Sequence, residues 1–212
     1  MRMNEPDVLD VLERVGAFKK GHFVFTSGLH SDTYINKDSV YPYTRETSLL
    51  CRAFAEKFAD KEIDVVVGPA VGAAILSQWT AHHLSEIRGK NVFGVYADKD
   101  GAGGFILKRG YDKVSAGKRV LVVEDLVTTG GSVKKVVDAL RAIGAQVAGV
   151  AVLCNRGNVP KSAVGDPDEF YALVNVELDT WTDGSCPLCE RHVPINTDMG
   201  HGKEYLAAKM QA

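Results

Sequence analysis

The chain has 212 residues, of which 45% are apolar and 25% charged, and its 25 Lys and Arg nearly balance its 27 Asp and Glu. This composition predicts one globular domain, and the balanced charge argues against a broad nucleic-acid-binding surface. The longest apolar run, 147–154, is too short to span a membrane, and residues 1–13 lack the features of a signal peptide. With only four cysteines, we expect a soluble cytoplasmic protein with reduced thiols and with neither nucleic acid nor a membrane as partner.

The N-terminal part of the chain predicts two helices around a short hairpin. Apolar residues between Val8 and Val15 recur at helical spacing, and Gly16 follows as a stop. Residues 21–36 place aromatic and apolar side chains on both sides of Ser27-Gly28, which is typical of short strands joined by a turn. The apolar positions of residues 43–59 keep to one face of a second helix.

From residue 63 onward, short apolar strands alternate with helices. We expect strands at 64–68, 91–96, 119–123 and 147–153, and helices at 73–84 and 133–143. This alternation predicts an α/β fold with a mostly parallel central sheet, flanked by helices on both faces and joined by right-handed connections. A glycine-rich, charged stretch at 98–114 predicts a functional loop with a short hairpin, and the residues after 180 predict an irregular C-terminal extension.

The segment 119–132 carries the clearest chemical signal. Glu124 and Asp125 follow a buried strand, where open α/β sheets bind their ligands. Residues 128–132, Thr-Thr-Gly-Gly-Ser, then open a helix and offer hydroxyls, backbone N–H groups and a positive dipole end to an anion. The alternative is a plain strand-to-helix turn with Thr129 or Ser132 as its N-cap. Adjacent buried carboxylates are costly without a ligand, which favours a binding site.

The segment from Val120 to Ser132 resembles the phosphoribosyl pyrophosphate motif of type I phosphoribosyltransferases. Within that family, the chain is most similar to the members that use orotate. Residues 25–31 and 34–36 resemble the family's N-terminal hood, 68–72 its pyrophosphate loop and 99–101 its flexible loop. The resemblance implies a single type I phosphoribosyltransferase domain over 1–212, with the hood mostly in 1–40 and a tail at 180–212. It also implies a homodimer and the transfer of a phosphoribosyl group to orotate in UMP synthesis.

The same resemblance implies roles for individual residues. Those implied for phosphoribosyl pyrophosphate are Ala70, Val71, Gly72, Lys99, Glu124, Asp125, Leu126, Val127, Thr128, Thr129, Gly130, Gly131 and Ser132. Those implied for orotate are Ser27, Gly28, Tyr34, Thr128 and Arg156, with the Arg156 guanidinium on the orotate carboxylate. Lys99 and Asp125 are the implied catalytic residues, and Mg²⁺ would be carried by substrate oxygens rather than by protein ligands.

Two alternatives for the function stay open on the sequence. A phosphoribosyltransferase for a purine base would share the donor motif without needing Arg156, and a regulator could bind phosphoribosyl pyrophosphate without turning it over.

His30, next to Ser31 in the hood segment, is a candidate to face the base or to pack in the core.

A pair of cysteines lies in the tail. Cys186 and Cys189, with His192 and His201 farther along, have the spacing of half a zinc site, and the alternative is a pair of plain thiols.

Overall fold

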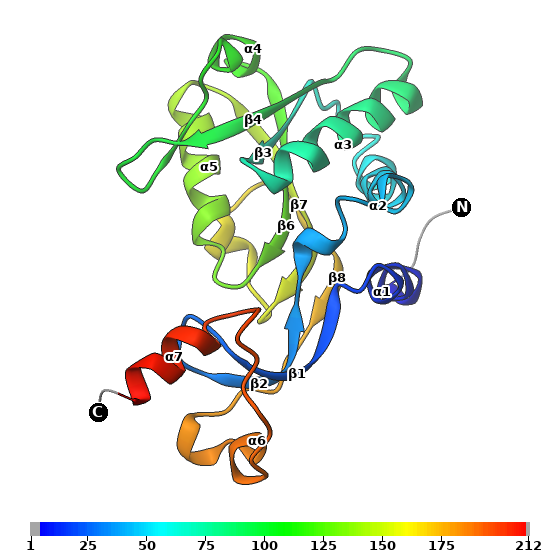
Figure 1. Cartoon of the computed structure of the whole chain (residues 1–212). Coiled ribbons are helices and arrows are strands. Elements are labelled where there is room, and N and C mark those ends of the chain that lie inside the picture. Colours follow the sequence, from blue (N-terminus) through cyan, green and yellow to red (C-terminus); the bar gives the residue numbers. More distant parts are fainter. Residues whose placement is uncertain (1–4, 211–212) are drawn as a thin grey trace.

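A computed structural model describes residues 5–210, so the first residues of the N-terminal segment considered above lie outside the described residues. The main sheet has the strand order β5-β4-β3-β6-β7-β8 and is parallel except for β5 (Figure 1). This confirms the predicted α/β fold with a mostly parallel sheet. The strands are β3 (Val65–Pro69), β4 (Phe93–Lys99), β5 (Phe105–Ile106), β6 (Arg119–Val127), β7 (Gln146–Arg156) and β8 (Phe170–Val176).

Helices cover both faces of this sheet because successive strand side chains point to opposite sides. On β6, Leu121 and Val123 belong to the core that includes the helices α1 (Glu5–Arg14), α2 (Thr44–Lys57) and α3 (Gly72–Arg88). Val120 and Val122, on the opposite face, belong to a second core with α5 (Gly131–Ala142). A short helix, α4 (Tyr111–Ser115), precedes β6.

The strands extend beyond their predicted ends. β6 runs to Val127 instead of stopping at Val123, so Glu124 and Asp125 lie within the strand and not after it. The neighbour β3 pairs with β6 only as far as Val122, and β6 therefore continues past β3 on that side. The edge strand β8 was not predicted; it pairs in parallel with β7 and shows little of the clean burial alternation that marks a strand in sequence.

The glycine-rich stretch after residue 98 contains the expected hairpin, in which β4 pairs with β5. Lys99 is the last residue of β4, where it lies opposite Phe105, so the connection itself begins at Asp100. The Asp100 side chain closes the connection by accepting hydrogen bonds from the N–H groups of Ala102 and Gly104, each at 2.8 Å.

A second, two-stranded sheet is formed by β1 (Phe18–Val24) and β2 (His30–Ile35), which pair antiparallel as predicted. The tail after residue 180 runs beside this hairpin (Figure 1). We expected this tail to be irregular, but it contains the helices α6 (Pro187–Glu190) and α7 (Gly202–Lys209). Backbone N–H groups of Asn196 and His201 donate to the carbonyls of His22 and Val24, at 2.7 and 2.8 Å, which binds the tail to β1.

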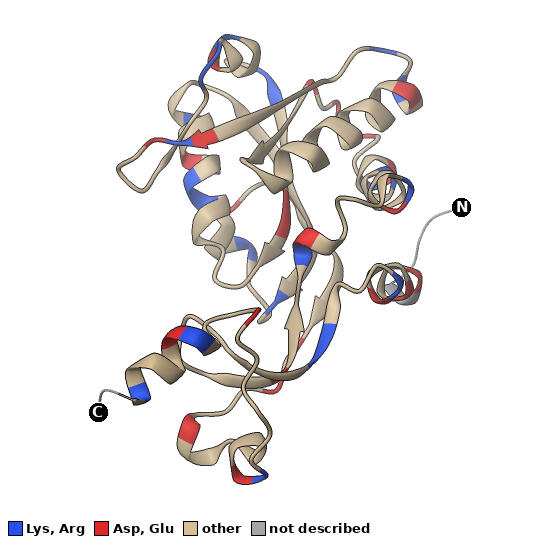
Figure 2. Cartoon of the chain, in the orientation of Figure 1, with Lys and Arg blue, Asp and Glu red and all other residues tan. Residues whose placement is uncertain are grey.

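Basic and acidic residues are interspersed along the surface helices, for example along α5 and α7 (Figure 2). Among residues 5–210, we find no helix that combines the length and the apolar character needed to cross a membrane.

Candidate active site

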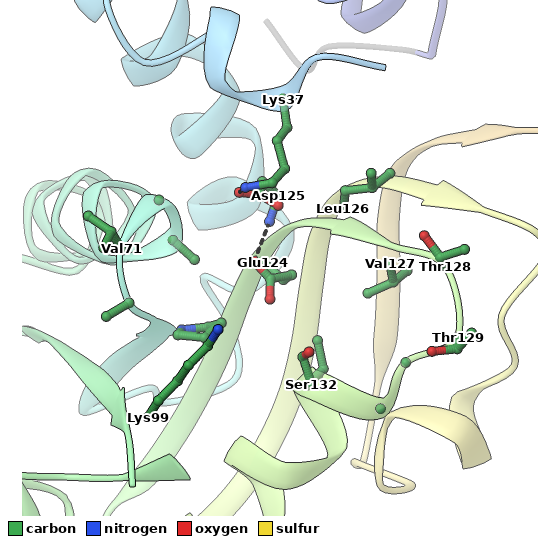
Figure 3. Close-up of a pocket in the computed structure, with 17 residues that line it drawn as sticks. Lys37, Val71, Lys99, Glu124, Asp125, Leu126, Val127, Thr128, Thr129 and Ser132 are labelled. Carbon is green, nitrogen blue, oxygen red and sulfur yellow. Dashed lines mark hydrogen bonds and ion pairs between the residues drawn. The ribbon is translucent and has the colours of Figure 1, made fainter. Parts of the chain in front are cut away.

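The candidate site lies where the connections leave the sheet in opposite directions. The chain passes from β3 to β4 on one side, and β6 lies on the other side of β3. Ligands of open α/β sheets bind at such a point, beyond the carboxyl ends of the strands. Here the free end of β6 and the segment that follows β3 face one cavity of about 380 Å³ (Figure 3).

The two predicted carboxylates of β6 are both buried at this cavity, with exposed fractions of 9% for Glu124 and 5% for Asp125. Lys37 donates to Asp125 Oδ2 at 3.0 Å, and the Tyr41 hydroxyl donates to the same oxygen at 2.5 Å. The Glu124 side chain accepts a hydrogen bond from the backbone N–H of Asp125 at 3.0 Å. The Asp125 charge is therefore compensated within the protein, whereas Glu124 has no cation at hydrogen-bond distance among the described residues.

Burial decides the electrostatics of this group. It raises the pKa of Glu124 well above its ordinary range, and the neighbouring Asp125 charge adds to the increase. Burial is the largest single influence on Lys37 and by itself would lower its pKa. The charges and hydrogen bonds of Asp125 and Asp38 together outweigh it and raise the pKa, so Lys37 is a stable cation. Burial and the Asp125 charge also raise the pKa of Tyr41, which keeps its hydroxyl as a donor. Together these groups form an acidic wall that can accept hydrogen bonds from the hydroxyls of a ligand.

A helix N-terminus forms the opposite wall of the cavity. Residues 128–130 connect β6 to α5, and Gly131 and Ser132 form the start of that helix. The first N–H groups of a helix have no hydrogen-bond partner within the helix. Gly130 precedes α5 with φ of 79°, a left-handed conformation that favours glycine. These N–H groups and the hydroxyls of this segment suit a phosphate. The described residues that line the cavity are Lys37, Pro69, Ala70, Val71, Gly72, Ala73, Lys99, Glu124, Asp125, Leu126, Val127, Thr128, Thr129, Gly130, Gly131, Ser132 and Val133.

The segment after β3 closes the third side of the cavity. Its close approach to the acids depends on Gly72, because a Cβ atom there would lie 2.6 Å from the Tyr41 hydroxyl and 3.0 Å from Asp125 Oδ2. Lys99 reaches the same cavity from the end of β4, and Figure 3 shows its side chain directed toward the part of β6 that carries Glu124. An ammonium group and a backbone loop at this place suit a second anionic group, separate from the one at α5.

A second cavity of about 470 Å³ adjoins the first and shares Lys37, Leu126, Thr128 and Thr129 with it. Arg156, at the end of β7, has its guanidinium 3.3 Å from the Thr128 hydroxyl and 4.5 Å from the centre of the Phe25 ring. Burial lowers the pKa of Arg156, which leaves a cation that gains from an anionic partner. The lining residues of this second cavity are Phe25, Thr26, Ser27, Tyr34, Ile35, Asn36, Lys37, Asp38, Leu126, Thr128, Thr129, Arg156, Gly200 and His201.

The structure thus brings together most of the residues that the sequence singled out. Gly28, although it belongs to the described chain, is not among the residues that line the second cavity; it has φ of 79° in the turn between β1 and β2. His30 is fully buried and lies against His22 and Cys189, away from both cavities. The spacing allowed His192 and His201 as metal-ligating partners of Cys186 and Cys189. Among the described residues, however, His192 is not near these cysteines in a metal-ligating cluster, and His201 lines the second cavity, so neither is their partner.

Sequence reasoning missed Lys37 and Tyr41. Lys37 directly follows the hood segment that ends at Asn36, and Tyr41 follows four residues later. Lys37 and Asp125, however, are 88 residues apart in the chain. A lone lysine after a strand carries no local signal of a distant acid. Only the tertiary contact of the short helical turn 37–39 with β6 brings the pair together.

Comparison with known proteins agrees with this arrangement. The phosphoribosyl transferase domain matches residues 43–181. An orotate phosphoribosyltransferase of Caldanaerobacter subterraneus is 37% identical over 193 residues, which cover 91% of this chain and 96% of that protein. One of Pelotomaculum thermopropionicum is 38% identical over 192 residues, 91% and 95% of the two chains. This chain belongs to the orotate phosphoribosyltransferase family.

A solved structure has the same fold. The orotate phosphoribosyltransferase of Mycobacterium tuberculosis superposes with a TM-score of 0.66 at 23% identity and covers 81% of this chain and 96% of its own. A second structure of that enzyme, in complex with 5-phospho-alpha-D-ribosyl 1-diphosphate, gives a TM-score of 0.54 at 22% identity over 83% and 96% of the chains. At these identities the likeness bears on the fold alone.

Proposed function

We propose that the protein transfers the phosphoribosyl group of phosphoribosyl pyrophosphate to orotate, giving orotidine 5′-monophosphate and pyrophosphate in pyrimidine biosynthesis. The observation that carries the proposal is the pair of adjoining cavities. One combines a helix N-terminus with two buried carboxylates, and the other has a guanidinium on its wall. Such a pair accommodates a phosphorylated sugar beside a flat, anionic base.

The first cavity is assigned to the donor. Its 5′-phosphate would bind at 128–132 and the start of α5, while Glu124 and Asp125 accept hydrogen bonds from the ribose hydroxyls. The pyrophosphate would then lie against the segment from Ala70 to Gly72 and Lys99. In this placement each charged or hydroxyl-bearing part of the donor meets a complementary wall of the cavity.

Mg²⁺ would bind together with phosphoribosyl pyrophosphate. The side chains in the first cavity that could bind a metal offer oxygen atoms, which suit a hard cation such as Mg²⁺. Asp125 Oδ2, however, already accepts hydrogen bonds from Lys37 and Tyr41. Binding through substrate oxygens and water therefore fits these residues better than direct ligation by the protein. When bound, Mg²⁺ neutralises charge on the pyrophosphate.

The second cavity is assigned to orotate. The planar guanidinium of Arg156 matches a carboxylate through two parallel hydrogen bonds, and Thr128, Ser27 and Tyr34 line the same space. A ring nitrogen of orotate would lose its proton and bond to the anomeric carbon as the bond to the pyrophosphate oxygen breaks. The electron pair of the broken bond leaves on pyrophosphate, and the proton goes to pyrophosphate or to water. Lys99 stabilises the negative charge that develops on this leaving group.

Product formation with different acceptors tests the assignment. The protein is incubated with phosphoribosyl pyrophosphate, Mg²⁺ and one of orotate, uracil, hypoxanthine, xanthine, guanine or adenine, and we expect a nucleotide product from orotate alone. Turnover of a purine would contradict the acceptor assignment while leaving the donor site intact. Donor binding without turnover of any base would contradict an enzymatic function.

Substitution of Arg156 tests the carboxylate contact separately. Losing a charge-assisted, two-pronged hydrogen bond costs about 1.5–3 kcal/mol, so Arg156→Ala should raise the KM for orotate roughly 10-fold to 100-fold. Arg156→Lys keeps the charge without the planar fork and should give an intermediate KM. The KM for phosphoribosyl pyrophosphate should change little in both variants, and an equal increase for both substrates would exclude the proposed role.

We further propose a cytoplasmic homodimer. Exposed apolar side chains of the neighbouring helices α2 and α3, Leu49 and Ile75, together with Val71 between β3 and α3, support an interface close to the first cavity. The free cysteines agree with a reducing compartment. Light scattering coupled to size-exclusion chromatography should give twice the chain mass, and a monomer at working concentration would refute the dimer.

A further inference from the structure

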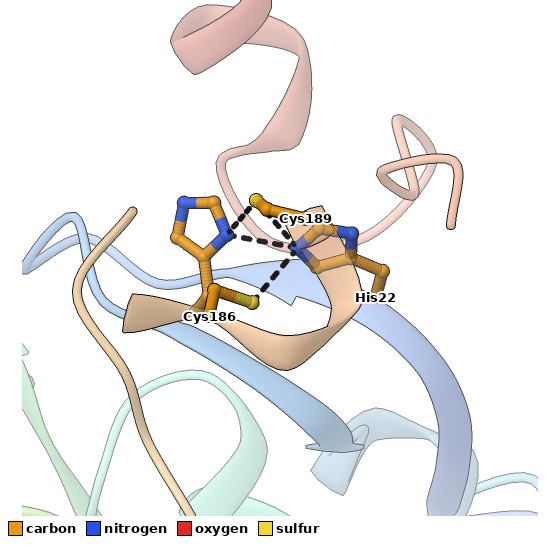
Figure 4. Close-up of side chains that lie close together, drawn as sticks. His22, Cys186 and Cys189 are labelled. Atoms are coloured by element: carbon orange, nitrogen blue, oxygen red, sulfur yellow. Dashed lines mark hydrogen bonds between the residues drawn. The ribbon is translucent and has the colours of Figure 1, made fainter. Parts of the chain in front are cut away.

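Four metal-ligating side chains converge outside both cavities. They are His22 of β1, His30 of β2, and Cys186 and Cys189 at the two ends of the first turn of α6. Their ligand atoms all lie within 4.8 Å of one another. Figure 4 shows the ring of His22 and the sulfur atoms of both cysteines directed toward one point.

The distances match those around a single tetrahedral ion. Typical bonds of about 2.0 Å from zinc to nitrogen and about 2.3 Å to sulfur place a nitrogen and a sulfur ligand roughly 3.5 Å apart. Cys186 Sγ and Cys189 Sγ lie 3.6 and 3.8 Å from His22 Nε2, and Cys189 Sγ lies 3.4 Å from His30 Nδ1. The two histidine nitrogens are 2.8 Å apart, a hydrogen-bond distance that has to lengthen only slightly to admit an ion.

The surroundings of His22 prepare it to bind a metal. The Nδ1 atom of His22 lies 2.8 Å from the Val193 carbonyl oxygen, which accepts a hydrogen bond from the Nδ1–H group. This leaves the lone pair of Nε2 directed at the other metal-ligating side chains. His30 packs at right angles to the Tyr205 ring, with the ring centres 5.0 Å apart. His22, His30 and Cys186 are almost completely buried, a costly arrangement for two imidazoles unless they share a partner.

We propose that His22, His30, Cys186 and Cys189 bind one structural zinc ion. Two sulfur and two nitrogen ligands in tetrahedral arrangement are typical of zinc, and four protein ligands leave no open position for a substrate. A two-iron cluster would place its cysteines on one iron and its histidines on the other, whereas here Cys189 lies within 4 Å of both histidines.

The ion would fasten the tail to the hairpin. The histidines come from β1 and β2, and Cys186 is 164 residues away from His22 in the chain. Beyond the cysteines, Gly200 and His201 of the tail line the second cavity, where His201 Nε2 lies 2.8 Å from the Thr26 hydroxyl. The zinc site therefore holds one wall of the cavity assigned to the acceptor base.

Metal analysis of the full-length protein tests this proposal directly. After purification under reducing conditions, or reconstitution with Zn²⁺ in the absence of oxygen, we expect one zinc per chain by mass spectrometry. Replacement by Co²⁺ should give the thiolate charge-transfer and visible bands of a tetrahedral site with sulfur ligands. Because these measurements use the unaltered chain, they decide the question even if variants fail to fold. Absence of both metals, or a disulfide between Cys186 and Cys189 in the reduced preparation, would overturn the proposal.

Variants identify the ligands. Cys189→Ser and His22→Gln should lose most of the bound zinc, whereas His192→Gln, a matched change at an exposed histidine of the same tail, should keep it. Retention of zinc by Cys189→Ser, or its loss from His192→Gln, would contradict the assignment. Removal of zinc by a chelator should lower the Tm and expose the tail to limited proteolysis, and an unchanged Tm with a protected tail would contradict the structural role.

A further test, which measures enzyme kinetics, rests on the proposed function. If the second cavity binds orotate, removal of zinc should raise the KM for orotate more than that for phosphoribosyl pyrophosphate. Failure of orotate turnover in the zinc-loaded protein would count against the proposed function and not against the zinc site, because metal content and spectra are measured without substrate.

Discussion

Replacement of Gly130 by alanine tests whether the phosphate-binding segment depends on a close backbone contact. Gly130 has φ of 79°, which costs an alanine about 1–2 kcal/mol. A Cβ atom there would also lie 2.6 Å from the carbonyl oxygen of Ala163 and 3.1 Å from Val159 Cγ1. The obstacle is backbone, so it cannot rotate away. The contact falls about 0.8 Å short of an ordinary separation of 3.4 Å, and the start of α5 has to move by a similar distance.

The displacement should weaken the donor site more than the fold. A shift of about 1 Å in a binding group can cost roughly 100-fold, so we expect Gly130→Ala to lower kcat/KM for phosphoribosyl pyrophosphate by about 10-fold to 100-fold. Calorimetric titration with the donor and steady-state kinetics measure this effect, and thermal unfolding measures the accompanying loss of stability.

Gly144→Ala is the matched control. Gly144 follows the other end of α5 with φ of 78°, but its Cβ atom would meet nothing within 4 Å. It should lose about 1–2 kcal/mol of stability, the same backbone cost as at Gly130, and keep the donor affinity of the unaltered protein. Equal donor affinity in the two variants would refute the argument that contact with Ala163 positions the phosphate-binding segment.

Two further predictions concern charge in the donor cavity. Lys99→Ala should lower kcat about 10-fold to 100-fold with little change in the KM for orotate. Lys108 is an exposed lysine of the same region, and Lys108→Ala should leave kcat unchanged. Equal kcat values for the two variants would exclude a role for Lys99. Because the pKa of Glu124 is raised in the folded state, the fold favours its protonated form. Stability should therefore fall as the pH rises above the ordinary glutamate range and through this raised pKa. Glu124→Gln should remove that dependence in thermal unfolding measured from mildly acidic to alkaline pH, and an unchanged profile would show that Glu124 is not the group that titrates.

Local patterns in the sequence determined much of this protein. The alternation of apolar strands and amphipathic helices after residue 63 predicted the parallel sheet with its two covered faces, because burial on both faces requires continuous apolar strands. The residues from Glu124 to Ser132 predicted a phosphate site, since strand, acids, glycines and helix start are contiguous in the chain. The roles of Arg156 and Lys99 followed from resemblance to a family and stay predictions; in the structure Lys99 lines the first cavity and Arg156 the second.

Tertiary structure decided the features that join distant segments. The Lys37 partner of Asp125 and the histidine partners of the tail cysteines lie 88 and more than 150 residues away from them, and no local pattern records such contacts. The spacing favoured nearby histidines of the tail as partners of the cysteines. In the structure His30 contacts Cys189 instead, because the tail folds back along the hairpin. Periodicity reports which face of an element is buried, and only the packing of elements reports what that face meets.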